Sequence, residues 1–567
     1  MRSVKVIIIG GVAGGASAAA RLRRLDEKAE IIMLERSGYI SYANCGLPYY
    51  IGGVIADPEE LTLQTPEKFW NRFRIAVKTR HEVTAIHPER KTVIVKNLKT
   101  GEIFEETYDK LLLSPGARPV RPSLPGIDSS RLFTLRTVED TLAIRRFVEL
   151  EHPRSAVLAG GGYIGLELAE NLRDLGLEVT IVQRPKQLLN PFDPDMAAFI
   201  HAKLRSRGIR LLLGHSVEGF REKENTMEVL LKDAASVSAD LVILAIGVAP
   251  DSHLAAEAGL KQGIKGSIAV NDRMETSVPD IYAVGDAVEV EHQITGEKTL
   301  ISLAGPANRQ GRIAADNICG GDSRYPGSQG SSIVKLFDMT AASTGINEKT
   351  AVQLGIDYDK VILSPQSHAS YYPGGKMMTM KILWEKKSLR LLGAQIVGYD
   401  GVDKRIDVLA AAMYAGLSAA RLKELDLAYA PPYSSAKDPV NMAGFLIESV
   451  SAGNIRQFHW NEADALPRDG SVHLLDVRTE PEFASGHLEG FVNIPLDELR
   501  EHLDQLDPAK PVRAVCQSGL RSYLACRILS QEGFSCSHLS GGYRFYQTVL
   551  EDRCAAESAW PCGVDKT

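Results

Sequence analysis

The sequence predicts an α/β protein of several domains, and three observations lead to this prediction. At 567 residues the chain is too long for one hydrophobic core. Two segments, one at the N-terminus and one near residue 160, each read as strand, glycine-rich turn, helix and strand. From about residue 332 the sequence pattern changes to one of alternating strands, and a small α/β segment follows from about residue 471. We therefore expect two interleaved Rossmann-type dinucleotide-binding domains, an α+β domain and a C-terminal α/β domain.

Composition narrows the functional classes. The net charge of −6 gives no indication of a nucleic-acid or membrane-surface partner. The seven cysteines form no regular framework and no Cys-x-x-Cys pair, so we expect neither a disulfide scaffold nor a metal site. The N-terminal run 4–9 reads as a strand and not as a signal peptide, and no apolar run is long enough to cross a bilayer. A reducing cytoplasm is the expected location.

The first dinucleotide unit begins with a strand at 4–9. The turn Gly10-Gly11-Val12-Ala13-Gly14-Gly15 follows, then a helix at 16–25 and a strand at 31–34 that ends on Glu35. A carboxylate at this spacing is typical of one that binds a ribose hydroxyl. Val12 holds the middle glycine position, so a plain tight turn stays open as an alternative.

The second unit carries all three fingerprint glycines, Gly160, Gly162 and Gly165, between a strand at 156–159 and a helix at 166–175. Two such units in one chain predict two bound nucleotides, commonly a flavin and a nicotinamide. The next strand, 179–182, ends in Gln183-Arg184 in place of an acid. Gln183 could bond a ribose and Arg184 could contact a 2′-phosphate, so the choice between NADH and NADPH is open, with a modest preference for NADH expected.

Later segments carry a family resemblance. The runs 111–116 and 241–247 close the two units, and 281–287 ends a strand on Asp286 beside a glycine. Over residues 1–445 the chain resembles the pyridine nucleotide–disulfide oxidoreductase family. The resemblance implies FAD and NADH or NADPH as cofactors, with Asp286 on the ribityl chain. The expected cofactor-binding residues are Gly10, Gly11, Gly14, Gly15, Glu35, Gly116, Gly160, Gly162, Gly165, Gln183, Gly247, Asp286 and Ala304.

The resemblance also sets the expected domain boundaries. Residues 327–445 are expected to form the dimerisation domain of a homodimer, and the polar stretch 446–470, with Pro467 and Gly470, reads as a linker long enough to let the last domain move. The other expected domains are an FAD-binding domain at 1–118 and 246–326, an NAD(P)H-binding domain at 119–245, and the C-terminal domain at 471–555.

Cys45 is the candidate redox cysteine. It lies in Ser41-Tyr42-Ala43-Asn44-Cys45-Gly46-Leu47-Pro48, and Tyr50 holds the position where a second cysteine would complete a disulfide. A single thiol is instead oxidised to a sulfenic acid or a mixed disulfide with a small thiol. A structural, buried cysteine is the alternative.

This segment, together with 10–18 and 428–433, resembles coenzyme A–disulfide reductases and the rhodanese-fused NADH-dependent persulfide reductases. The resemblance implies that Ser41 and Asn44 flank the sulfur and that Ser17, Arg21 and Arg24 approach coenzyme A. Arginines are suited to phosphate contacts, although a solvated helix face would look the same.

No His–Glu acid–base pair occurs near residues 425–445. The resemblance instead assigns Tyr371 and Tyr429 to the active site of the opposite subunit. A phenol can hydrogen-bond or protonate a departing thiolate. Tyrosines that merely pack in a dimer interface are the alternative.

Cys516 is the second candidate cysteine. The runs 474–478, 482–483, 486–490 and 493–495 resemble the rhodanese domain. Cys516 follows a strand at 512–515 and opens the six-residue loop that ends at Arg521, ahead of a helix at 522–529. Backbone N–H groups curled around the sulfur would stabilise a persulfide anion. An inactive rhodanese-like module is the alternative.

Together these features favour a flavoenzyme that reduces persulfides, polysulfides or coenzyme A disulfides with NAD(P)H. In this interpretation Cys45 forms a mixed disulfide with coenzyme A, Cys516 carries sulfane sulfur, and small-molecule thiols, persulfides or disulfides are the partners. A sulfurtransferase or sulfur carrier with a reductive module is a second hypothesis. An NADH oxidase is a third, because a lone cysteine beside a flavin can become a sulfenic acid.

Overall fold

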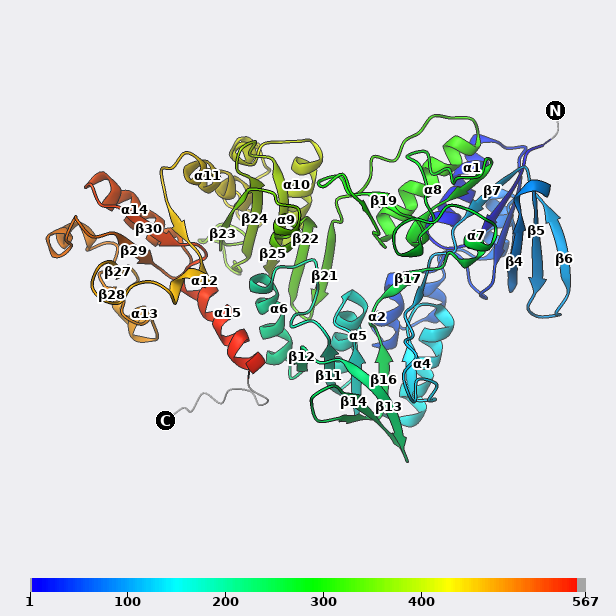
Figure 1. Ribbon diagram of the computed structural model, residues 1–567, viewed down its shortest axis with the longest axis horizontal. Coiled ribbons are helices and arrows are strands. Elements are labelled where there is room, and N and C mark those ends of the chain that lie inside the picture. Colours follow the sequence, from blue (N-terminus) through cyan, green and yellow to red (C-terminus); the bar gives the residue numbers. More distant parts are fainter. Residues whose placement is uncertain (1–2, 558–567) are drawn as a thin grey trace. The chain divides into compact units, whose positions relative to one another are not determined.

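The computed structural model describes residues 3–557, which fall into two compact units. One unit contains residues 3–185 together with 208–330, and the other contains residues 186–207 together with 331–557 (Figure 1). No helix in the described part of the chain is long and apolar enough to cross a membrane.

The first unit contains a parallel sheet with the strand order β18-β7-β1-β2-β3. Its central strand reads KVIII and is buried on both faces, as expected for a parallel strand covered by helices. The helix α1 (Gly14–Leu25) follows it and packs along α8 (Ala304–Ile318), with so little space that a Cβ on Gly311 would lie 2.3 Å from Gly14 O. The strands are β1 (Lys5–Ile9), β2 (Glu30–Glu35), β3 (Ala76–Thr79), β7 (Lys110–Leu113) and β18 (Ile281–Ala283).

A second parallel sheet has the order β12-β11-β10-β16-β9. The helix α5 (Tyr163–Asp174) starts at the fingerprint glycines, three residues before the expected start at 166. The turn is tight enough for this because Gly160 adopts φ +116°, where a Cβ would lie 2.1 Å from Ala245 O. The strands are β9 (Leu132–Thr134), β10 (Ser155–Ala159), β11 (Glu178–Gln183), β12 (Arg210–Leu213) and β16 (Leu241–Leu244).

Smaller elements complete this unit. Two antiparallel sheets follow the orders β4-β5-β6 and β13-β14-β15, and two short ribbons pair β17 with β8 and β19 with β20. The short helix α2 (Leu47–Ile51) packs against α5 and α4 (Val138–Glu151). The remaining bounds are β4 (His81–His87), β5 (Thr92–Asn97), β6 (Ile103–Thr107), β8 (Ala117–Pro119), β13 (Val217–Lys223), β14 (Thr226–Leu231), β15 (Val237–Ala239), β17 (Val248–Pro250), β19 (Val290–Glu291), β20 (Lys298–Thr299), α3 (Pro66–Phe73) and α7 (His253–Glu257).

The second unit contains an antiparallel sheet with the order β21-β22-β25-β24-β23. The helix α10 (Val402–Tyr414) packs on β22 and β25. The other elements are α6 (Pro194–Ser206), β21 (Ser332–Leu336), β22 (Met339–Gly345), α9 (Glu348–Gln353), β23 (Tyr358–Leu363), β24 (Thr379–Glu385), β25 (Leu391–Gly398) and α11 (Pro439–Ser451).

The C-terminal sheet is parallel, with the order β26-β30-β29-β27-β28. Its central strand, β29 (Val512–Val515), matches the predicted strand, and α14 (Leu520–Gln531) begins two residues before the expected 522. This sheet confirms the predicted C-terminal α/β domain. The other elements are β26 (Gln457–Phe458), α12 (Trp460–Ala463), β27 (His473–Asp476), α13 (Glu480–Ala484), β28 (Val492–Asn493), β30 (Cys536–Leu539) and α15 (Gly542–Glu557).

The predicted mobile linker at 446–470 is wrong for most of its length. The helix α11 continues to Ser451, and β26 joins the C-terminal sheet beside β30. The same domain is hydrogen-bonded to the edge strand β23, because Gly541 N donates to Ile362 O and Ile362 N donates to Ser540 Oγ, both at 3.1 Å. Polar composition indicated a linker, but backbone pairing with residues far along the chain fixes the segment.

Candidate active sites

The first glycine-rich turn forms a close-packed cradle ahead of α1. A Cβ on Gly10 would lie 2.1 Å from Ser114 O, and one on Gly15 would lie 2.0 Å from Gly10 O, so neither position accepts a side chain. Glu35 at the end of β2 accepts hydrogen bonds from Gly11 N and Ser37 N, both at 2.8 Å. This cradle, with a helix N-terminus behind it and a carboxylate at the end of the next strand, fits a dinucleotide pyrophosphate and ribose.

The second turn repeats the arrangement. A Cβ on Gly165 would lie 2.2 Å from Gly160 O, whereas Gly162 and Gly247 face open space within 4 Å. Gln183 Oε1 accepts a hydrogen bond from Gly161 N at 3.0 Å, just as Glu35 does from Gly11. Gln183, the last residue of β11, therefore stabilises the turn through this hydrogen bond.

Arg136 connects two of the predicted site residues. Its Nη2 donates to Asp286 Oδ2 at 2.8 Å. With the Asn44 amide oriented to satisfy both groups, Asn44 donates to Arg136 O and accepts from Arg136 Nη1, each at 3.0 Å. Gly116 lies beside the same guanidinium, because a Cβ there would be 3.2 Å from Arg136 Nη2. The sequence offered no signal for Arg136, which lies between β9 and α4 outside any motif.

The cysteine segment is attached to the first glycine turn. Ser41 N donates to Gly11 O at 2.8 Å, and Ser41 itself adopts φ +44°, a conformation that costs a non-glycine residue about 1–3 kcal/mol. Cys45 follows in a short 3₁₀ turn, 44–46, at the start of α2. Strain held by hydrogen bonds on both sides of Ser41 fixes the direction in which this segment leaves the turn.

Cys45 is solvent-accessible, yet the surrounding protein still desolvates it. This desolvation and the nearby Glu167 carboxylate raise the pKa of the thiol, while Arg136 acts to lower it. Burial raises the pKa of Glu167 itself to about 7, and Tyr49 Oη donates to Glu167 Oε1 at 3.4 Å. Glu167 lies one helical turn after Tyr163 in α5, and the sequence gives no sign of its desolvation. The reactivity of Cys45 is therefore coupled to a carboxyl that titrates near neutral pH.

A cavity of about 370 Å³ opens beside the cysteine segment, and three expected residues, Ser17, Arg24 and Ser41, line it. Arg72 and Arg312 add two further cations, and no carboxylate in the described part of the chain forms an ion pair with Arg24, Arg72 or Arg312. Arg21 does not line the cavity, because its Nε is paired with Asp316 Oδ1 at 2.7 Å. Three arginines without counter-ions favour a ligand with several phosphates. The rest of the lining is Ala16, Ala20, Gln64, Phe69, Phe73 and Asn308.

The two predicted tyrosines meet in the second unit. Tyr371 Oη and Tyr429 Oη lie 2.5 Å apart, and the two side chains are 72% and 45% exposed. The buried Arg405 holds the loops that carry them, since its Nη2 donates to Ser367 O at 2.9 Å and to Asp438 Oδ2 at 3.0 Å. The pair is thus preorganised and presented outward.

Cys516 lies buried at the end of β29. Gly519 N donates to Cys516 Sγ at 3.2 Å, and Ser522 Oγ lies 3.3 Å from the same sulfur. Arg521 closes the loop by donating from both terminal nitrogens to Glu482, each at 2.7 Å. The loop itself is braced by α15, because Tyr543 N donates to Cys516 O at 2.8 Å. The Gly519 N–H, at the N-terminus of α14, points at the sulfur, and a donor in this position suits a persulfide anion.

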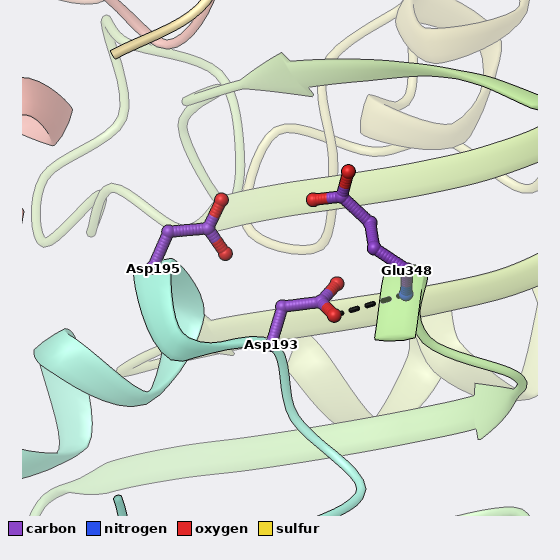
Figure 2. Close-up of side chains that lie close together, drawn as sticks. All are labelled: Asp193, Asp195 and Glu348. Carbon is purple, nitrogen blue, oxygen red and sulfur yellow. Dashed lines mark hydrogen bonds between the residues drawn. The ribbon is translucent and has the colours of Figure 1, made fainter. Parts of the chain in front are cut away.

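A buried carboxylate cluster, Asp193, Asp195 and Glu348, lies elsewhere in the second unit (Figure 2). Lys381 Nζ sits among these carboxylates, 3.0 Å from Asp193 Oδ2 and 2.8 Å from Asp195 Oδ1, and it also pairs with Glu348. The ammonium therefore fills the position that a cation would take. Trp460 of α12 donates to Asp195 Oδ2 at 3.2 Å, so the cluster also anchors the start of the C-terminal domain.

The model of the pyridine nucleotide-disulphide oxidoreductase family matches residues 4–311 of this chain. The chain belongs to this family. The family's dimerisation domain matches residues 331–439 and a rhodanese-like domain matches 459–548, which confirms the presence of these two predicted domains. Membership makes the chain an oxidoreductase that uses FAD and a pyridine nucleotide.

Individual relatives in this family are similar over most of the chain. Coenzyme A disulfide reductase of Staphylococcus aureus strain JH9 is 40% identical over 442 residues, which are 78% of this chain and 99% of the relative. The crystal structure of reduced Bacillus anthracis CoADR-RHD matches with a TM-score of 0.95 and 46% identity, over 98% of this chain and 99% of the other. A NAD-dependent persulfide reductase from A. fulgidus matches with a TM-score of 0.90 and 38% identity, over 95% and 99%.

Proposed function

We propose that this protein reduces persulfides, polysulfides or coenzyme A disulfides with NAD(P)H, and that Cys45 forms a mixed disulfide with coenzyme A. The observation that carries the proposal is an accessible Cys45 in the segment whose Ser41 lines a cavity with three arginines, none of which forms an ion pair with a described carboxylate. The relatives named as a coenzyme A disulfide reductase and a persulfide reductase support it.

The two glycine cradles fit FAD and a pyridine nucleotide. We assign Gly10, Gly11, Gly14, Gly15 and Glu35 to FAD, with Gly116, Asp286 and Ala304, and Gly160, Gly162, Gly165, Gln183 and Gly247 to the pyridine nucleotide. When bound, FAD supplies the relay of two electrons from the pyridine nucleotide to sulfur. Arg136 holds Asp286 and Asn44 in fixed positions, so it orients both the cofactor side and the thiol side of the site.

Cys45 then acts as the nucleophile. Its thiolate attacks the outer sulfur of a persulfide R–S–SH, forms Cys45–S–SH, and releases R–S⁻ with the electron pair of the broken S–S bond. The coenzyme A thiolate attacks Cys45 Sγ, which gives the Cys45–coenzyme A disulfide and HS⁻. Two electrons and one proton return this disulfide to the Cys45 thiolate and the coenzyme A thiol. Ser17, Arg24 and Ser41 line the cavity that we assign to coenzyme A, whereas Arg21 pairs with Asp316 and does not line it.

The tyrosine pair completes the site across a homodimer. Tyr371 and Tyr429 share a hydrogen bond and point outward, which suits donation of a proton to a departing thiolate of the partner subunit. We place the homodimer in the cytoplasm, acting on small molecules without a nucleic-acid or membrane partner.

A second candidate function is sulfur transfer. The buried Cys516, whose sulfur accepts a hydrogen bond from Gly519 N, favours it, and Arg521 belongs to that loop. We propose that this loop loads sulfane sulfur for the reductive site. A water-forming NADH oxidase from Lactobacillus brevis is 29% identical over 80% of this chain, which keeps oxidase activity as a control measurement.

The test is Cys45→Ser in the full chain. We expect the variant to bind FAD and to show NADH-driven bleaching, but to lose turnover with persulfide, polysulfide and coenzyme A disulfide by more than a thousandfold. Cys319→Ser is the matched control, because Cys319 is the other exposed thiol described in the first unit. Coenzyme A released from the wild type, and not from Cys45→Ser, by a thiol reductant would locate the mixed disulfide. Persulfide turnover retained in Cys45→Ser would contradict the proposal.

A further inference from the structure

The Cys516 loop has almost no free positive charge. Of the residues from Cys516 to Arg521, only Arg521 is charged, and Glu482 binds both of its terminal nitrogens at 2.7 Å. The hydrogen bond from Arg521 holds the pKa of Glu482 at about 2, so this carboxylate is ionised at every working pH. The single cation of the loop is therefore neutralised by a fixed carboxylate.

The neighbouring arginines are also engaged. Arg478 is buried, with Nε 3.0 Å from both Asp476 carboxylate oxygens and Nη2 2.7 Å from Oδ2. Arg544, which braces the loop through its backbone N–H to Gln517 O, directs its guanidinium to Thr379 Oγ1 at 3.2 Å and to Met377. These arginines offer no open guanidinium to a small dianion.

Apolar surface adjoins the loop instead. Leu520, the fifth residue of the loop, is 56% exposed, and Leu524, one helical turn later in α14, is 43% exposed. Residues four apart lie on the same face of a helix, so the two leucines form one apolar strip leading from the loop. A donor with an uncharged organic carrier can cover this strip, whereas a small inorganic anion cannot.

We propose that Cys516 takes sulfane sulfur from organic persulfides whose carrier is uncharged near the sulfur, such as a pantetheine-type arm, and discriminates against thiosulfate. This inference rests on the proposed sulfur-carrying role of Cys516. In the transfer, the Cys516 thiolate attacks the outer sulfur of R–S–SH, the R–S bond breaks, and R–S⁻ leaves with the bonding electron pair. The proton stays on the transferred sulfur, giving Cys516–S–SH. Thiosulfate would have to bring a double negative charge to a loop whose cation is already paired.

The Arg521–Glu482 pair also indicates which substitution should weaken the preference for organic persulfides over thiosulfate. Glu482→Gln removes the negative charge and frees the positive charge of Arg521 for a dianion. The substitution keeps an oxygen that can accept from Thr479 N, which Glu482 caps at 3.0 Å at the start of α13. Glu480→Gln is the matched control, since Glu480 is an exposed acid of the same helix that contacts no loop arginine among the described residues.

The experiment loads the full FAD-containing chain without pyridine nucleotide, using either pantetheine persulfide or thiosulfate. Persulfide on Cys516 is trapped by alkylation and quantified by mass spectrometry against time. We expect the wild type to load at least tenfold faster from pantetheine persulfide, and Glu482→Gln to gain at least tenfold with thiosulfate. Glu480→Gln should gain with neither donor. Leu524→Ser should slow loading from pantetheine persulfide and leave the thiosulfate rate unchanged.

Equal loading of the wild type from both donors would overturn the inference, as would a Glu482→Gln variant that gains nothing with thiosulfate. Both results would leave the sulfur-carrying role of Cys516 intact. If Cys516 loads from neither donor, its sulfur-carrying role is overturned. The experiment therefore separates a failure of that role from a failure of the donor preference.

Discussion

Lys381 is the residue whose removal the structure lets us predict in most detail. Its side chain is 0% exposed, and its ammonium pairs with Asp193, Asp195 and Glu348. Lys381→Ala would leave these carboxylates with Lys360 as their remaining paired lysine, bound to Glu348 at 2.5 Å. Removing one partner of a buried ion pair costs about 3–5 kcal/mol, because the remaining charge is left uncompensated.

A loss of about 4 kcal/mol corresponds to a fall in Tm of about 8–16 °C for a unit of this size, at about 2–4 °C for each kcal/mol. Thermal unfolding followed by circular dichroism measures it. Lys386→Ala is the control, because Lys386 pairs with Asp357 at 3.0 Å while the two side chains are 51% and 79% exposed. A surface pair of this kind contributes about 0–1 kcal/mol. A loss for Lys381→Ala no larger than for the control would refute the reasoning.

The pH dependence of the loss gives a second check. Burial acts to raise the pKa of Glu348, but Lys381 and Lys360 hold it at about 2 in the wild type. This carboxylate therefore stabilises the fold above its ordinary pKa of 4.5, and that contribution is lost as the pH falls toward 2. Without Lys381 the carboxyl pKa values rise, and protonation relieves their repulsion in acid. The Tm difference between variant and wild type should thus be larger at pH 8 than at pH 5.

The emptied position should also accept a metal ion. The carboxylate oxygens of Asp193, Asp195 and Glu348 lie within 4.8 Å of one another. Oxygen ligands at this spacing suit a hard divalent cation. Mn²⁺ or Ca²⁺ should therefore raise the Tm of Lys381→Ala and leave that of the wild type unchanged, whereas no response of the variant would show that the oxygens cannot converge on one ion.

Two further predictions concern the reductive site. Glu167→Gln removes a carboxylate that raises the pKa of Cys45, so the pH profile for iodoacetamide alkylation of the NADH-reduced enzyme should move to lower pH, and a shift to higher pH would exclude this coupling. Discrimination between NADH and NADPH should stay below about a hundredfold in kcat/KM, or about 2.7 kcal/mol, and Arg184→Ala should reduce the use of NADPH more than that of NADH. An unchanged ratio in Arg184→Ala would show that another residue contacts the 2′-phosphate.

The sequence by itself determined the fold class, and it predicted the chemistry of the two cysteines. Glycine turns such as Gly160–Gly165 can be recognised in the sequence, because the tight turn leaves no space for a side chain at Gly160 and Gly165. The family resemblance places a second cysteine five residues after Cys45, and Tyr50 at that position cannot form a disulfide with it. The loop between β29 and α14 was equally readable, since a cysteine between a buried strand and a helix is a local pattern.

Only the tertiary structure decided what surrounds these residues. Arg136 contacts Asp286 from 150 positions away, Glu482 neutralises Arg521 from 39 positions away, and the pairing of Arg21 with Asp316 spans 295 positions. The structure also contradicts the predicted mobile linker at 446–470, since β26 pairs with β30 and the C-terminal domain is hydrogen-bonded to β23. The physical reason is that charge compensation, desolvation and edge pairing depend on which groups the fold brings within a few ångströms. A motif fixes the conformation of its own backbone, but residues elsewhere in the chain supply its counter-ion and determine its exposure to solvent.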